Sequence, residues 1–214
     1  MKLLHLTFSP RGEQSESTQL SQAIVDRLCC EHTVSQIARR DWAQHATSSI
    51  DGAYAHALAN AARRTDDMPS SESLAASEML IRELENADLV VIGTPMHNFT
   101  VPASLKTWID LIVRVNRSFN ITPEGKVGTL KDKPVYIAIA SGGFFGSERS
   151  RQPDFLTPYL KAILATVGLH DLRFFSAQGM ALGSEAVQAG KAKAMEDFTK
   201  LCSSQASNKL SLHA

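Results

Sequence analysis

The stretch from Ser9 to Thr18 is rich in hydroxyl side chains and runs directly into a predicted helix. The hydroxyls of Ser9, Ser15, Ser17 and Thr18 are hydrogen-bond donors without negative charge, and Arg11 adds a cation. The first N–H groups of a helix lack partners and lie at the positive end of its dipole, so a phosphate group could bind here. The alternative is that Ser15 or Ser17 merely caps the helix. Because the glycine spacing of a dinucleotide fingerprint and the lysine of a P-loop are both missing, a mononucleotide fits better.

A second stretch, between Pro95 and Pro102, combines an apolar side chain, an aromatic ring and an amide. Such a loop can hold a flat heteroaromatic ring, which needs apolar contact on a face and hydrogen bonds to its ring nitrogens and carbonyls. The residues concerned are Met96, His97, Asn98 and Phe99. An ordinary rigid turn is the alternative. His97 is a candidate proton donor or substrate contact, or simply a polar loop residue.

A third stretch reads Ser141-Gly142-Gly143-Phe144-Phe145. Paired glycines let a backbone approach a ligand closely, and exposed backbone amides can stabilise a negative charge on it. The alternative is a plain glycine turn. The adjacent phenylalanines fit that alternative poorly, because a loop seldom buries two large rings, and they could line an aromatic pocket or a subunit contact.

Apolar periodicity alternates between strands and helices along the whole chain. Strands are predicted over 2–8, 33–37, 88–93, 134–140 and 169–175, and helices over 17–30, 51–62, 71–85, 102–115, 157–167 and 184–202. Residues 118–133 form a long excursion that could be a hairpin. We therefore predict one domain over residues 1–214, with an α/β, doubly wound, five-stranded parallel sheet covered by helices on both faces. Ligands bind outside the carboxyl ends of such strands, where the three stretches begin.

Composition restricts the class of partner. The 22 basic residues balance the 22 acidic ones, so no net field attracts nucleic acid or an anionic membrane. We find no signal peptide and no apolar run of the ~20 residues that cross a bilayer, which predicts a cytoplasmic protein. Cys29, Cys30 and Cys202 show no metal-type spacing and are expected to be reduced thiols, with no metal bound.

Together the three stretches resemble the FMN-dependent NADH:quinone oxidoreductase and azoreductase family, a branch of the flavodoxin-like proteins. The resemblance spans nearly the whole chain. It rests on Ser9–Ser17, on Pro95–Phe99 followed by Leu105–Asp110, on Ser141–Gly143, and on Thr157–Leu160 with Gly168.

The resemblance implies FMN as the bound cofactor and a homodimer with FMN near the subunit interface. Phosphate contacts would come from Ser9, Ser15, Glu16 and Ser17, ring and ribityl contacts from Met96, His97, Asn98 and Phe99, and pyrimidine contacts from Ser141, Gly142 and Gly143. Phe119, Phe144 and Phe145 would help line a substrate pocket built from two chains. His97 stands where tyrosine is more usual, which puts substrate preference in doubt, and Gln178 stands where an acid is common.

We therefore expect two-electron transfer from NADH or NADPH through bound flavin to quinones and azo compounds, in a ping-pong cycle that cleaves azo bonds to amines. The nicotinamide preference is open, since no acid or arginine can be assigned to the ribose 2′ position. The alternative is a one-electron flavodoxin-type carrier, which usually has an acidic docking surface. A phosphate-ester hydrolase would need a cysteine or aspartate nucleophile in the first loop, and Ser9–Ser17 contains neither.

Overall fold

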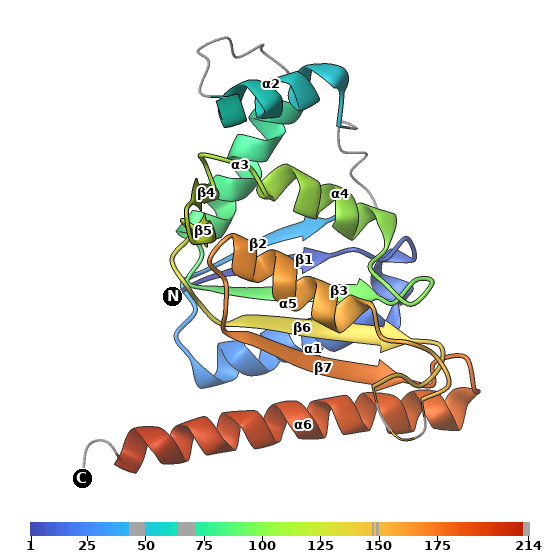
Figure 1. Cartoon of the computed structure of the whole chain (residues 1–214). Coiled ribbons are helices and arrows are strands. Elements are labelled where there is room, and N and C mark those ends of the chain that lie inside the picture. Colours follow the sequence, from blue (N-terminus) through green and yellow to red (C-terminus); the bar gives the residue numbers. More distant parts are fainter. Residues whose placement is uncertain (43–49, 64–71, 147, 149, 212–214) are drawn as a thin grey trace.

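Five parallel strands form the central sheet: β1 (Lys2–Thr7), β2 (Gln36–Asp41), β3 (Leu89–Pro95), β6 (Val135–Ser141) and β7 (Leu172–Gln178). The computed structural model describes residues 1–42, 50–63, 72–146, 148 and 150–211 (Figure 1). The strand order is β2-β1-β3-β6-β7, and every neighbouring pair is parallel. The chain reverses its direction of winding between β1 and β3, so the loops after these two strands meet at the switch point.

Helices cover both faces of this sheet (Figure 1). One face carries α1 (Glu16–Glu31) and α6 (Ser184–Ser211); the other carries α3 (Glu72–Asn86), α4 (Ala103–Ile112) and α5 (Leu156–Thr166). The helix α2 (Gly52–Arg63) packs outside α3. The predicted doubly wound, flavodoxin-like sheet is therefore confirmed.

The alternation of side chains along each strand builds two separate cores. In β1, Leu4 and Leu6 pack toward α3, α4 and α5, whereas Leu3 packs toward α1 and α6. The central strand β3 divides in the same way, with Ile92 on the first face and Val91 on the second. Strands that are buried on both faces read as continuous apolar runs, which is why β3 and β6 are recognisable from the sequence.

Two strands begin later than the sequence predicts. The strand predicted at 33–37 is β2, which runs from Gln36 to Asp41, and the one predicted at 169–175 is β7, from Leu172 to Gln178. The first lies at an edge and reads Gln-Ile-Ala-Arg-Arg-Asp, so it lacks an apolar run to mark it. In the second case Leu169 is buried ahead of the strand and belongs to the core rather than to the ladder. The start predicted at Ser71 for α3 lies outside the described residues.

The predicted excursion contains the hairpin of β4 (Phe119–Thr122) and β5 (Gly125–Gly128). It packs at the amino end of the sheet, because Leu130 donates its N–H to the carbonyl of Val167, just before β7 begins. Among the residues that the structure describes, no helix is long and apolar enough to cross a membrane. Within the same ranges no group of three or more His, Cys, Asp or Glu side chains could hold a metal ion.

Candidate active site

The first turn of α1 presents a pair of buried hydroxyl groups. The Oγ atoms of Ser15 and Ser17 lie 3.0 Å apart. Ser15 stands at the N-cap position, yet its side chain makes no capping hydrogen bond. The alternative that Ser15 merely caps the helix is therefore wrong. Its hydroxyl is oriented toward Ser17 instead, which leaves the N–H groups of the first turn for another acceptor.

The loop that leads into this turn is shaped by Gly12 and a short 3₁₀ turn, η1 (Gly12–Gln14). Gly12 has a φ of +53°, a left-handed conformation that glycine adopts without a steric cost. The buried Ser9 holds the loop from the strand side, because its Oγ accepts the N–H of Arg11 at 3.3 Å. This loop therefore brings Ser9 to the turn that carries Ser15.

Glu16 contributes less to this site than the sequence suggests. Its carboxylate pairs with Lys191 of α6, with Nζ and Oε2 2.7 Å apart. The ion pair offsets the negative charge of Glu16 beside a predicted phosphate, so only its backbone N–H is suited to bind the anion. In the same turn, Thr18 Oγ1 is buried without a hydrogen-bond partner among the described residues. A phosphate oxygen would be a suitable acceptor for such a group.

The second loop is a strained turn directly after β3. His97 and Thr100 exchange both backbone hydrogen bonds, at 2.9 and 3.0 Å. Between them, Asn98 and Phe99 have φ of 48° and 70°. A left-handed conformation costs roughly 1–2 kcal/mol for a residue with a side chain. The Phe99 ring is also 43% exposed. Such strain concentrates at functional sites, which favours a binding loop over an ordinary turn.

The third loop follows β6 and is fixed by Gln178 at the end of β7. The backbone N–H of Phe145 donates to Gln178 Oε1 at 2.8 Å. Gly142 and Gly143 do not have positive φ, so neither glycine is required by backbone conformation. At Gly143 the absent side chain makes room for Gln152, whose Oε1 would lie 3.0 Å from an added Cβ. A Cβ on Gly142 would lie 3.4 Å from the Ala181 Cβ, its nearest neighbour, and this leaves the backbone approachable.

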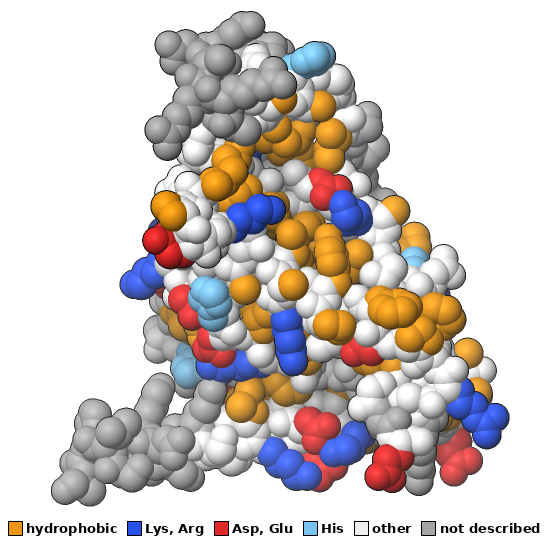
Figure 2. Space-filling view, in the orientation of Figure 1, with side chains coloured by type: hydrophobic (Ala, Val, Ile, Leu, Met, Phe, Trp, Pro, Cys, Tyr) orange, Lys and Arg blue, Asp and Glu red, His pale blue; other side chains and the backbone are white. Residues whose placement is uncertain are grey.

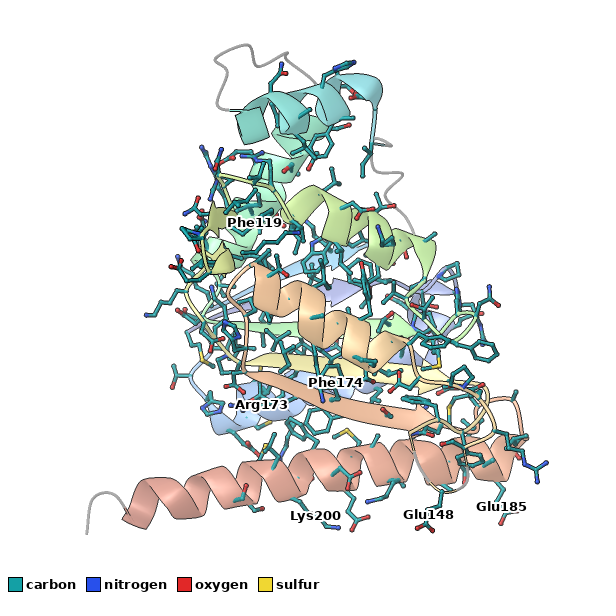
Figure 3. The ribbon with its side chains drawn as sticks, viewed as in Figure 1. Phe119, Glu148, Arg173, Phe174, Glu185 and Lys200 are labelled. Carbon is teal, nitrogen blue, oxygen red and sulfur yellow. The ribbon has the colours of Figure 1, made fainter. Side chains whose placement is uncertain are left out.

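The three phenylalanines predicted for a pocket do not meet within one chain. Phe145 is buried in the core, and Phe144 packs near Gly179 at the carboxyl edge. Phe119 lies in the β4–β5 hairpin, at the end of the sheet opposite Glu148 and Glu185 (Figure 3). The sequence could not show this separation, because it does not tell at which end of the sheet the hairpin packs.

A close helix–strand contact places the phosphate turn over β3. A Cβ on Gly93 would lie 2.5 Å from Ser21 Oγ and 2.9 Å from the Ser17 carbonyl oxygen. Only glycine allows this approach, which sets the first turn of α1 directly beside the end of β3. The first two loops are therefore positioned relative to one another by the packing of α1 on Gly93.

A cavity of about 440 Å³ lies between α1 and β2, and its lining includes Glu13 and Thr18 from the first stretch as well as His5 and Arg39. At its base His5 is buried, with Nε2 2.8 Å from Ser21 Oγ and Nδ1 3.3 Å from the Arg39 guanidinium. Burial, reinforced by Arg39, lowers the pKa of His5 to about 4. The polar groups around His5 bond to one another, and the Arg39 guanidinium also donates to Gln22 Oε1 at 2.6 Å. The cavity is therefore a weaker candidate site than the three loops.

The three loops together fit FMN. The uncapped helix turn and its buried hydroxyls suit a phosphate dianion, the strained turn presents an aromatic ring and an amide, and the glycine loop offers open backbone. Gln152 is a further residue of this site, because its side chain contacts the second and third loops. It lies nine residues after Gly143 in a segment without a recognisable motif, and nothing in the sequence could have indicated its position.

Solved structures support the fold. An azoreductase from Bacillus anthracis superposes with a TM-score of 0.78 at 24% identity, over 92% of this chain and 97% of that one. An FMN-dependent NADH-azoreductase of the same species, solved in complex with FMN, gives a TM-score of 0.76 at 23% identity, over 94% and 98% of the two chains. At these identities the likeness concerns the fold alone.

Sequence relatives are more similar. The family model described as flavodoxin-like fold matches residues 1–201. FMN-dependent NADH:quinone oxidoreductase 4 of Pseudomonas fluorescens is 47% identical over 87% of this chain and 88% of its own length. FMN-dependent NADH:quinone oxidoreductase 5 of Burkholderia lata is 44% identical, over 87% and 89%. The chain therefore belongs to the flavodoxin-like family that contains the FMN-dependent NADH:quinone oxidoreductases.

Proposed function

We propose that this protein is an FMN-dependent oxidoreductase that passes two electrons from NADH or NADPH to quinones and azo compounds. The observation that carries the proposal is the first turn of α1, where the buried hydroxyls of Ser15 and Ser17 leave the helix uncapped. Relatives at 47% and 44% identity are named for FMN, NADH and quinone, which supports the same assignment.

Bound FMN would supply the hydride chemistry, and the chain supplies binding, orientation and electrostatics. Ser9, Ser15 and Ser17 would hold the phosphate together with backbone N–H groups of α1. Met96, Asn98 and Phe99 would contact the ring and ribityl chain. The backbone amides of Gly142 and Gly143, with Ser141, would stabilise negative charge near the pyrimidine side.

The overall exchange balances as a hydride from the nicotinamide plus one proton, together reducing a quinone to a hydroquinone. Cleavage of an azo bond to two amines takes two hydrides and two protons, which is four electrons in all. The exposed His97 is a candidate donor of the proton, alongside water. No other acid or base is required, because the positions of the two rings govern hydride transfer.

Steady-state kinetics test this function. With NADH and a benzoquinone, we expect sustained NADH oxidation and parallel double-reciprocal lines, since one substrate leaves before the other binds. A flavodoxin-type carrier would accept electrons from dithionite but would not consume NADH without a separate reductase. The absence of NADH oxidation by FMN-loaded protein would contradict the proposal.

We further propose that the whole chain, residues 1–214, acts as one FMN-binding domain in a homodimer. Apolar side chains gather over α4 and α5 in Figure 2. Phe99 and Phe155 are 43% and 59% exposed near the carboxyl edge. A partner could cover them and could bring its own residues to the site, next to Phe144. Sedimentation should give twice the chain mass; a monomer with full activity would contradict this arrangement.

The cytoplasmic location expected from the sequence stays a prediction.

A further inference from the structure

Gln152 lies where the second and third loops meet. Its Nε2 atom donates to Ser141 Oγ at 2.9 Å and lies 3.5 Å from the Met96 sulfur. Ser141 ends β6 and Met96 follows β3, so one amide group joins the carboxyl ends of two neighbouring strands. The Ser141 hydroxyl is itself buried and lies 3.8 Å from the same sulfur.

The other end of the same amide lies against the glycine loop. A Cβ built on Gly143 would come within 3.0 Å of Gln152 Oε1. The amide therefore occupies the space that a side chain at position 143 would need. In this way the position of Gln152 also fixes the backbone of the third loop.

The segment that carries Gln152 is anchored on its far side. The N–H of Phe155 donates to the carbonyl oxygen of Phe99 at 3.0 Å, so the segment is tied to the strained turn. Asp154 Oδ1 accepts the N–H groups of Leu156 and Thr157, at 3.0 and 2.9 Å, and so caps α5. Gln152 is thus held between a helix start and the second loop, and its amide has little freedom to turn away.

We propose that Gln152 is a positioning residue for the flavin site, clamping the Ser141 hydroxyl and the Gly143 backbone relative to Met96. This inference rests on the proposed function, because these three residues are expected to contact FMN. Because Gln152 donates to Ser141, the Ser141 oxygen acts as an acceptor on that side, and its own proton is directed toward the Met96 sulfur, 3.8 Å away. The clamp thereby sets which hydrogen-bonding groups the third loop presents to the reduced flavin, whose negative charge they stabilise.

Two substitutions separate the polarity of the amide from its bulk. Gln152→Ala removes both the hydrogen bonds and the contact with Gly143. Gln152→Glu keeps the shape but replaces the donor by a carboxylate, which forces the Ser141 proton to turn toward it. Gln188→Ala, on the exposed surface of α6, is the matched control.

Titration of FMN-free protein with FMN, followed by fluorescence quenching, measures the binding affinity. Dye equilibration measures the midpoint potential of the bound flavin. The thermal midpoint of the FMN-free protein measures stability. We expect Gln152→Ala to bind FMN roughly tenfold more weakly than the control, because a buried hydroxyl loses its partner. In Gln152→Glu the affinity for reduced FMN should fall about tenfold relative to the affinity for oxidised FMN. For a two-electron couple, this change makes the midpoint potential of the bound flavin about 30 mV more negative than in the control. This shift should shrink as the pH is lowered and the carboxylate takes up a proton.

A role in packing alone predicts a different pattern, in which Gln152→Glu matches the control in potential at every pH. That result, in protein whose wild type binds FMN, would overturn the inference and leave the proposed function intact. If Gln152→Ala fails to fold, the isosteric Gln152→Glu still decides the question. Failure of the wild type to bind FMN would overturn both the inference and the proposed function.

Discussion

Ser15 Oγ and Ser17 Oγ lie 3.0 Å apart, buried at the start of α1, and Ser15 does not cap the helix on which it stands. A helix start with free N–H groups and two neutral hydroxyls is suited to a dianion. The position of this pair beside the switch point between β1 and β3 is the basis of the phosphate site.

Replacing both hydroxyls by Ser15→Ala and Ser17→Ala should weaken FMN binding by tenfold or more. A hydrogen bond to a charged group contributes about 1.5–3 kcal/mol, and the loss should concern the phosphate only. Titration with FMN and with riboflavin, which lacks the phosphate, checks this selectivity. Ser184→Ala, at the exposed start of α6, should bind both like the wild type. An equal loss for riboflavin would mean that the serines maintain the fold rather than bind phosphate.

Gly93→Ala should both destabilise the protein and weaken FMN binding. The added methyl group would lie 2.5 Å from Ser21 Oγ and 2.9 Å from the Ser17 carbonyl oxygen, so α1 must move away from β3. Overpacking of this kind costs about 1–3 kcal/mol of unfolding free energy. Urea unfolding of FMN-free protein measures the cost. Gly52→Ala is the control, because no atom lies within 4 Å of its added methyl. Unchanged stability of Gly93→Ala would show that α1 packs less closely on β3 than these distances indicate.

Phe99→Gly should reduce activity without reducing stability. The substitution relieves the left-handed strain at a φ of 70°, and this relief offsets the conformational entropy that glycine adds to the unfolded chain. The free energy of unfolding should stay constant or rise by up to about 1 kcal/mol, while KM for quinone rises. Asn116→Gly is the control, since it relieves a φ of 61° next to the hairpin, where it should leave KM unchanged. A clear fall in stability with unchanged KM would assign the strained turn a structural role.

The polar network around His5 should make stability depend on pH. Its pKa, lowered to about 4 by burial and by Arg39, lies below the ordinary value of 6.5, so between these values the unfolded chain binds a proton that the native protein does not. The free energy of unfolding should therefore fall as the pH drops from 6.5 to 4, by up to about 3 kcal/mol.

Urea unfolding across this range measures the slope, and His5→Gln should flatten it. The Glu78 carboxyl has its pKa lowered to about 2, chiefly by a hydrogen bond from Arg117, and its contribution is lost only below pH 4.5. The two effects are thus separable by pH. The same slope in His5→Gln as in the wild type would show that other groups govern the decline.

The sequence predicts those helices and strands whose pattern of apolar residues matches the faces that are buried. Buried strands such as β3 and β6 appear as apolar runs, and α4 shows a clear apolar face with Trp108 and Ile109 buried. The polar edge strand β2 has no such signal, which explains its misplaced boundaries. The start of β7 was predicted too early because Leu169, just before the strand, is apolar and buried.

The candidate site was predictable in its loops but not in the contacts between them. Hydroxyls, prolines and glycines mark the three loops, since each has a local physical role. The hydrogen bonds of Gln152 and Gln178 to other loops depend on tertiary packing, as does the pairing of Glu16 with Lys191. The location of Phe119 at the far end of the sheet likewise follows from where the hairpin packs.

Calorimetric titration of FMN-free protein with FMN and with riboflavin tests the phosphate site most directly. We predict saturable uptake of one FMN per chain, with a yellow product and markedly weaker binding of riboflavin. No heat of binding and no flavin absorbance in the product would contradict the account.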